Sequence, residues 1–209
     1  MKALILLLLL LLGIASLPKL PTVRVVFSPL TRAAYMAASK HIIDIKPSVT
    51  FPLKKQHGRI IIPTAKGQRV FRDGWIEKER DEDARYTYRG YWPSLHWHLV
   101  EGYNYGEVYY QNVVTQGGQW IQLNDEHSLS PDTSQFVVTS GALDGLGAPL
   151  IQLYQLKNGA WRENWKIEPN TWQVEQLEWL TANTLLVKEK HWDKNFSKSW
   201  FTYARLIIQ

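Results

Sequence analysis

The chain has 209 residues, which is long enough for one domain with a substantial core. It is 45% apolar and 21% charged, within the globular range, and it has ten Trp, ten Tyr and no Cys, which excludes disulfides and cysteine catalysis. The net charge of +5 is unevenly distributed: eleven Lys or Arg and a single acid, Asp44, lie between Ser16 and Arg72, whereas acids outnumber bases afterwards.

Residues 1–15 have the pattern of a secretory signal peptide. Lys2 gives the positive start, Leu4–Leu12 the apolar stretch, and Gly13-Ile14-Ala15 the small-residue cleavage site. The apolar stretch is shorter than the roughly 20 residues of a membrane span, and retention as an anchor is the alternative. Because secreted eukaryotic chains of this size usually contain disulfides, we expect a bacterial protein that is periplasmic or secreted.

Residues 16–54 are expected to form a basic N-terminal arm with a short helix. Ser28-Pro29 predicts the helix start, with Ser as the N-cap, and the stretch from Leu30 to Lys40 favours a helix that Pro47 cannot continue. Opposite charges on Ser16–Arg72 and on the rest of the chain suggest electrostatic docking between the two. The alternative is contact between the arm and an anionic surface.

Residues 55–209 are predicted to form an antiparallel β domain. Short β-branched and aromatic runs alternate with turns, and Asn158-Gly159 is the strongest hairpin signal among them. The last run places Trp200, Ala204 and Ile208 on one face. The predicted fold class is therefore all-β: a curved antiparallel meander, as a partial propeller, half-barrel or sandwich, with a short N-terminal helix.

From about Tyr86 onward, the pattern resembles the WD40-like propeller blades of uncharacterised exported bacterial proteins. The residues that carry the resemblance are Leu129-Ser130-Pro131-Asp132, Phe136-Val137-Val138, Ile151-Gln152-Leu153-Tyr154 and Asn158-Gly159. Such blades use the Ser-Pro-Asp turn to join two strands, and the resemblance implies no activity. The motif occurs once here, whereas a propeller typically has four to eight blades, so a partial structure is expected.

An aromatic-rich middle segment supplies the candidate binding residues. If several of its rings share a concave face, they could stack on sugars or grip a peptide. Core packing is the alternative role for the same rings. The candidate residues are Trp92, Tyr103, Tyr105, Tyr109, Tyr110 and Trp120.

Catalytic and metal-binding patterns are weak. His96 and His98 would share one face of a strand and could hold a metal ion with a third ligand from His127, Asp125 or Glu126; an exposed polar face is the alternative. Asp125 and Asp132 could serve a glycan hydrolase, yet no recognisable catalytic motif surrounds them. The chain has neither the Gly-x-Ser-x-Gly elbow nor a phosphate-binding loop. We therefore assign no catalytic residue, metal or cofactor.

The sequence favours a non-enzymatic exported binding protein that recognises a protein or a cell-envelope polymer through an aromatic-rich β surface. No nucleic-acid motif is present, so nucleic acid is not expected as a partner. Two alternatives remain open at this point. One is a glycan-active hydrolase that uses loop carboxylates, and the other is an immunity or inhibitor protein, which would also lack catalytic motifs.

Overall fold

The computed structural model describes residues 23–75, 83–104, 108–123, 127–141 and 148–209. These residues are almost entirely antiparallel β-structure with one short α-helix, which confirms the predicted fold class. The described strands form four sheets, which are named here by their position or strand number.

The terminal sheet has the order β1-β15-β14-β13 and contains Val25–Leu30, Ser199–Ile208, Thr184–Trp192 and Trp172–Thr181. The middle sheet has the order β12-β11-β10-β9 and contains Ala160–Ile167, Leu150–Lys157, Gln135–Ser140 and His127–Leu129. The five-stranded sheet has the order β4-β5-β6-β7-β8 and contains Gly74–Trp75, Asp83–Trp92, Trp97–Asn104, Val108–Thr115 and Trp120–Leu123. The β2–β3 hairpin contains Arg59–Thr64 and Gly67–Arg72.

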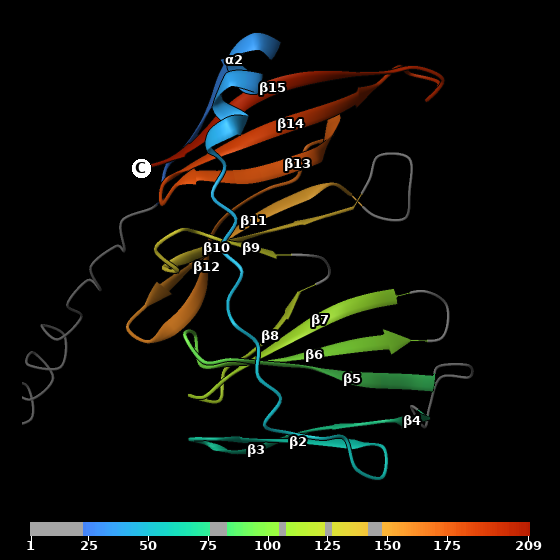
Figure 1. The fold of residues 1–209 in the computed structure, drawn as a ribbon. Helices are drawn as coiled ribbons and strands as arrows, with labels where there is room; N and C mark the ends of the chain where they lie inside the picture. The colour runs from blue at the N-terminus through green and yellow to red at the C-terminus, as the bar shows by residue number, and fades with distance from the viewer. Residues whose placement is uncertain (1–22, 76–82, 105–107, 124–126, 142–147) are drawn as a thin grey trace, which may run out of the picture.

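The four sheets stack face to face, with the terminal sheet and the β2–β3 hairpin at opposite ends (Figure 1). Apolar clusters fill the three interfaces. Trp97 meets Phe136 between the five-stranded and middle sheets, and Leu153 meets Trp179 between the middle and terminal sheets. Ile62 of the hairpin packs on the five-stranded sheet. Side chains that alternate along each strand therefore serve the two interfaces on either side of an inner sheet.

The N-terminal strand β1 completes the sheet formed by the last strands of the chain, pairing antiparallel with β15 from Val25↔Ile208 to Leu30↔Tyr203. The predicted helix start at Ser28-Pro29 is wrong, because both residues belong to β1. Proline is compatible with this position because β1 is an edge strand, where a missing backbone N–H costs no ladder bond. The helix instead begins after Thr31.

Helix α2 spans Arg32–Ala38, and the Thr31 side chain caps it by accepting a hydrogen bond from Ala34 N. A 3-10 turn, η1, follows at Ser39–His41. The helix buries Tyr35 against Tyr203 of β15, with ring centroids 4.7 Å apart. Helix α2 thereby covers part of the outer face of the terminal sheet.

The segment from Ile42 to Gly58, here called the strap, runs from the helix down the side of the stack to β2 (Figure 1). Ile43 N donates to Trp179 O over 2.8 Å in the terminal sheet. Thr50 exchanges two backbone hydrogen bonds with Tyr91 of β5, at 3.0 and 2.8 Å. The strap thus links the terminal sheet to the five-stranded sheet through backbone bonds.

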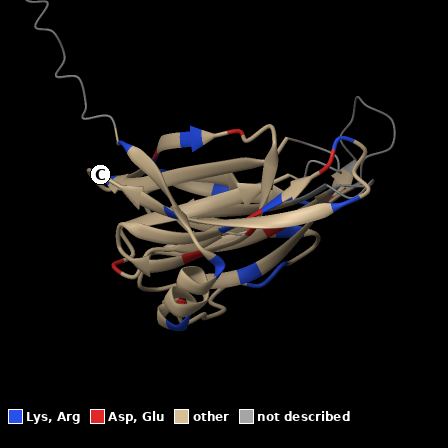
Figure 2. Cartoon of the chain, turned by 90° about the horizontal axis from the view of Figure 1, so that it is seen from above, with Lys and Arg blue, Asp and Glu red and all other residues tan. Residues whose placement is uncertain are grey.

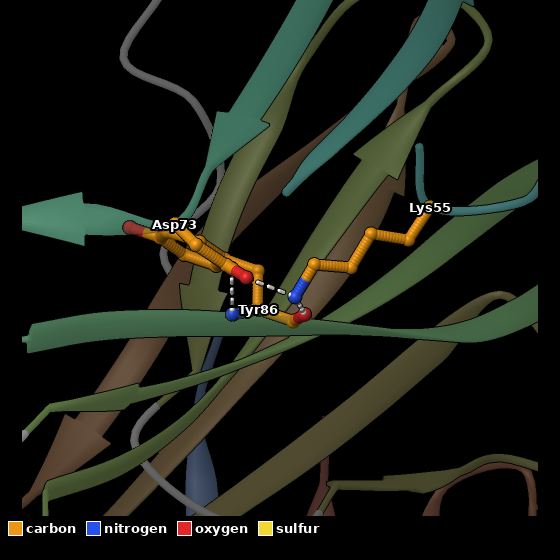
Figure 3. A network of polar contacts seen from close by, with 3 residues as sticks. All are labelled: Lys55, Asp73 and Tyr86. Carbon is orange, nitrogen blue, oxygen red and sulfur yellow. Dashed lines mark hydrogen bonds and ion pairs between the residues drawn. The ribbon is translucent and has the colours of Figure 1, made fainter. Parts of the chain in front are cut away.

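A three-residue polar network fastens the strap to the edge of β5 (Figure 3). Lys55 Nζ forms an ion pair with Asp73 and donates a 2.8 Å hydrogen bond to Tyr86 O. Asp73 Oδ1 accepts from Tyr86 N at 2.9 Å. The N–H and C=O of Tyr86 both point away from β6, where a neighbouring strand would otherwise bond. The side chains of Asp73 and Lys55 satisfy them instead.

Electrostatic docking of the basic N-terminal part is limited in the described residues. Among the ion pairs of the described residues, Lys55–Asp73 joins the chain up to Arg72 with the chain beyond it. Seen from above, Lys and Arg occur along the same strands and turns as Asp and Glu (Figure 2). No helix in the described ranges is long and apolar enough to cross a membrane.

Candidate binding surface

Two of the six aromatic residues predicted to bind a partner are part of the interior. Trp92 stacks on buried Trp97, with ring centroids 5.9 Å apart and planes within 17°. Tyr110 is 8% exposed, and its ring lies over Gly102, where a Cβ atom would stand 2.1 Å from the tyrosine Cε2. Core packing, the alternative role, accounts for both rings.

Tyr103 and Trp120 are about half exposed but lie on opposite faces of the five-stranded sheet. Trp120 pairs with Val114, whose side chain faces the β2–β3 hairpin, and Arg69 lies 4.9 Å above the indole ring. Tyr103 shares a face of β6 with Trp97 and Leu99, which face the middle sheet. Tyr105 and the side chain of Tyr109 lie outside the described residues. The structure therefore does not gather the described members of this set.

The two histidines considered as metal ligands have separate tyrosine partners. His98 Nδ1 lies 2.9 Å from the Tyr88 hydroxyl, and His96 Nδ1 lies 3.0 Å from the Tyr91 hydroxyl. His96 precedes β6 with a φ of 54°, so the two imidazoles do not repeat along one strand. Burial lowers the pKa of His98 and raises that of Tyr88 to about 12.

Asp132, one of the two carboxylates considered for hydrolysis, serves the Ser-Pro-Asp turn. Its Oδ1 accepts from the Ser130 hydroxyl at 2.6 Å and from Ser134 N at 3.1 Å, and its Oδ2 accepts from the Ser134 hydroxyl at 2.8 Å. Partial burial acts to raise the pKa of Asp132, but these hydrogen bonds hold it below its usual range. Asp125 lies outside the described residues.

A different aromatic cluster lies at the end of the β14–β15 hairpin, residues 188–203, here called the tip. Trp200 and Phe196 are each 49% exposed and Phe201 is 39% exposed. The turn is held by Asp193, which accepts from Ser197 N at 2.7 Å and from the Ser197 hydroxyl at 2.6 Å. Trp200 lies on the face of β15 that packs on the middle sheet further along the strand, whereas Phe201 lies on the opposite face.

One face of the tip combines an open aromatic ring with a chain of hydrogen bonds. His191 stacks on Trp200, its cross-strand partner, with centroids 5.4 Å apart and planes within 8°. Thr202 Oγ1 donates to Glu189 Oε2 at 2.5 Å and lies 2.6 Å from His191 Nε2. Because the hydroxyl proton is directed at Glu189, the His191 Nε2–H must be the donor to Thr202.

The other face of the tip pairs lysines with aromatic rings. Lys188 Nζ lies 4.2 Å from the centroid of the Phe201 ring, and Lys190 Nζ lies 4.3 Å from that of Trp192. Such contacts hold the long side chains over the rings, and Lys188 Nζ also forms an ion pair with Glu175 over 3.6 Å. The tip thus offers stacking surfaces and both hydrogen-bond donors and acceptors on one rigid hairpin.

The aromatic cluster at the tip could have been found from the sequence by pairing residues across the predicted hairpin. Asp193 to Lys198 form the connection between β14 and β15, and the predicted alternation correctly placed Trp200 on the face of Ala204 and Ile208. Counting outward from this turn pairs His191 with Trp200 and Lys190 with Phe201. The pairing identifies aromatic and polar neighbours that lie apart in the sequence.

A cavity of about 540 Å³ lies between the strap, the β9 edge of the middle sheet and β13. Asp44, Glu175 and Glu178 line it together with apolar residues. Burial, followed by the charge of Asp44, raises the pKa of Glu178. No group of three or more His, Cys, Asp or Glu in the described ranges is arranged to hold a metal ion.

Comparison of the chain with known protein families, curated proteins and solved structures found no match.

Proposed function

We propose that this chain is a non-enzymatic exported binding protein that recognises a cell-envelope polysaccharide through the tip of the β14–β15 hairpin. The observation that carries the proposal is the half-exposed Trp200 ring, which lies beside the Glu189–Thr202–His191 hydrogen bonds on one strand face. This surface replaces the aromatic middle segment as the candidate binding site.

The chemistry of the tip suits a sugar ring. A pyranose has an apolar face that packs on an aromatic side chain and hydroxyls that need donors and acceptors around that face. Trp200 supplies the platform, because His191 occupies one side and the remaining surface is open. Glu189 and Thr202 supply the polar partners, and the hairpin pairing restrains all four side chains before a ligand arrives.

The proposal is tested by co-sedimentation of the protein with purified peptidoglycan sacculi. Trp200→Ala is expected to weaken retention by about tenfold, which corresponds to about 1.4 kcal/mol. Thr202→Val, which removes the hydroxyl but keeps the shape, is expected to weaken it less. The matched control is Tyr103→Ala, because Tyr103 is as exposed as Trp200, at 48%, but lies in another sheet.

Two results contradict the proposal. One is the absence of wild-type retention on sacculi, and the other is an equal loss in the Trp200→Ala and Tyr103→Ala proteins. Thermal unfolding of each variant shows whether the fold is retained, so that a loss of binding is not confused with a loss of structure.

A further inference from the structure

The outer face of the β2–β3 hairpin is an uncovered sheet surface at the end of the stack opposite the terminal sheet (Figure 1). The inner face of the hairpin is buried: Ile60 and Ile62 are both 0% exposed. On the outer face, Ile61 and Val70 stand directly opposite each other and are 44% and 48% exposed. The terminal sheet, by contrast, has helix α2 on part of its outer face.

Arginines flank this apolar pair on both strands. Arg59 lies two residues before Ile61 on β2, and Arg72 lies two residues after Val70 on β3. Arg59 and Arg72 are also cross-strand partners, so they share the outer face with the apolar pair and are exposed. The surface, here called the β2–β3 face, is therefore an apolar patch with a guanidinium pair at one side.

The surrounding chain carries more positive charge than its ion pairs with Asp44 and Asp73 compensate. Residues 45–72 contain seven Lys or Arg and no Asp or Glu. Lys55 is paired with Asp73, and Arg69 lies over the Trp120 ring. In the described part of the chain, Arg59, Lys66 and Arg72 have no ion-pair partner. Charge complementarity therefore requires an anionic occupant.

We propose that the β2–β3 face docks an acidic protein segment that presents carboxylates beside an apolar side chain. Guanidinium groups bind carboxylates in a bidentate manner, and an apolar residue of the partner would cover Ile61 and Val70. A second copy of this chain fits poorly, because a two-fold contact would place this basic face against an identical basic face. A membrane fits less well, since the face has no Trp, Phe or Leu to insert.

This inference concerns a different surface from the tip and does not depend on the proposed function. It is tested by titrating the isotope-labelled full chain with a constrained hairpin peptide that carries Glu-Ser-Val-Ser-Glu, whose spacing mirrors that of Arg59 and Ile61. Backbone amide shifts are expected to concentrate in Arg59–Arg72. A peptide with Glu-Ser-Ser-Ser-Glu is expected to bind more weakly.

Paired variants separate a specific surface from general charge attraction. Arg59→Glu with Arg72→Glu is expected to lower the affinity for the Glu-Ser-Val-Ser-Glu peptide at least about tenfold. The matched control, Arg162→Glu with Arg205→Glu, makes the same change in net charge at exposed positions of other sheets. Ile61→Ser with Val70→Ser is expected to remove the preference for the valine peptide.

Four outcomes overturn the proposal. They are an equal loss in the control variant, amide shifts outside the hairpin, self-association through the β2–β3 face, and binding to phosphatidylglycerol vesicles without binding to the peptide. The last two would assign the face to a second copy or to a membrane.

Discussion

His127 of β9 has a buried imidazole with no polar partner among the described residues. Its ring lies among Trp92, Trp97 and Phe136, with centroid distances of 5.2 to 6.0 Å. Neither ring nitrogen has a hydrogen-bond partner in the described part of the chain. Burial lowers the pKa of His127 to about 4, so the imidazole is neutral at neutral pH. The buried, unpaired imidazole therefore lowers the stability of the fold relative to an apolar side chain at the same position.

Replacement of His127 by leucine is expected to stabilise the protein by about 1–3 kcal/mol, because an unsatisfied buried polar group is removed. The wild-type protein loses stability as the pH falls from the ordinary value of 6.5 towards about 4, since the unfolded chain then binds a proton that the folded chain does not. Urea unfolding across this range should show a smaller pH dependence for His127→Leu. An unchanged dependence would contradict this account.

At the residue scale, the sequence did not show which aromatic side chains would be buried and which would be exposed. Strand alternation does not decide which face of an inner sheet meets solvent, because both faces of the five-stranded sheet pack on neighbours. Trp92 and Tyr110 therefore became core residues, while Trp200 remained exposed. The difference depends on how far each strand extends beyond the sheet packed on it, which is a long-range property.

At the scale of elements, the Lys55–Asp73–Tyr86 network replaces a missing neighbour strand. Partial burial acts to raise the pKa of Asp73, but the bonds from Lys55 and Tyr86 N and the charges of Lys55 and Arg85 lower it overall. A carboxyl with a lowered pKa in the folded chain stabilises the fold above its unfolded pKa, near 3.8. That contribution is lost as the pH falls further, through the folded value.

Asp73→Asn is expected to lower the free energy of unfolding at neutral pH by about 1–2 kcal/mol, since the charged hydrogen bonds are weakened. The difference between the variant and the wild type should shrink as the pH falls below about 3.8, because the wild-type carboxyl is then protonated through its lowered folded pKa. Hydrogen exchange of the Tyr86 amide provides the local readout. Unchanged protection of that amide in the variant would show that Asp73 does not hold the β5 edge.

Local turn chemistry was the most predictable part of the elements. Asn158-Gly159 joins β11 and β12 with φ values of 52° and 73°, as the hairpin signal indicated. The Ser130-Pro131-Asp132 turn likewise precedes β10. The pairing of β1 with β15 was not predictable in this way, because its partners are separated by nearly the whole chain and neither strand encodes the other locally.

At the scale of the whole molecule, the strap bonds to the terminal sheet and to the five-stranded sheet. In the described stack the middle sheet lies between these two. Gly90 of β5 makes the close approach of the strap possible. A Cβ atom there would lie 2.3 Å from Val49 Cγ1 and 3.1 Å from Thr50 O, and the φ of 122° is itself unfavourable for other residues. The backbone of β5 and the strap therefore fit together because residue 90 has no side chain.

Gly90→Ala is expected to lower stability by about 1–3 kcal/mol and to reduce exchange protection at Thr50. If the strap acts as one unit, protection at Ile43, which bonds to Trp179 in the terminal sheet, should also fall. Gly67→Ala is the matched control, because Gly67 has a φ of 109° but nothing within 4 Å of the added atom. Equal effects of the two substitutions would assign the loss to backbone strain and not to the strap.

The position of β15 has a consequence for how the molecule is made. It lies between β1 and β14, so one of the earliest strands finds its partner only after the rest of the chain is available. During synthesis, β1 must wait with its apolar side chains uncovered while the inner sheets form. The inner sheets of a nascent chain can thus fold early. The terminal sheet is completed last, when β1 pairs with β15 in a slow step set by chain topology.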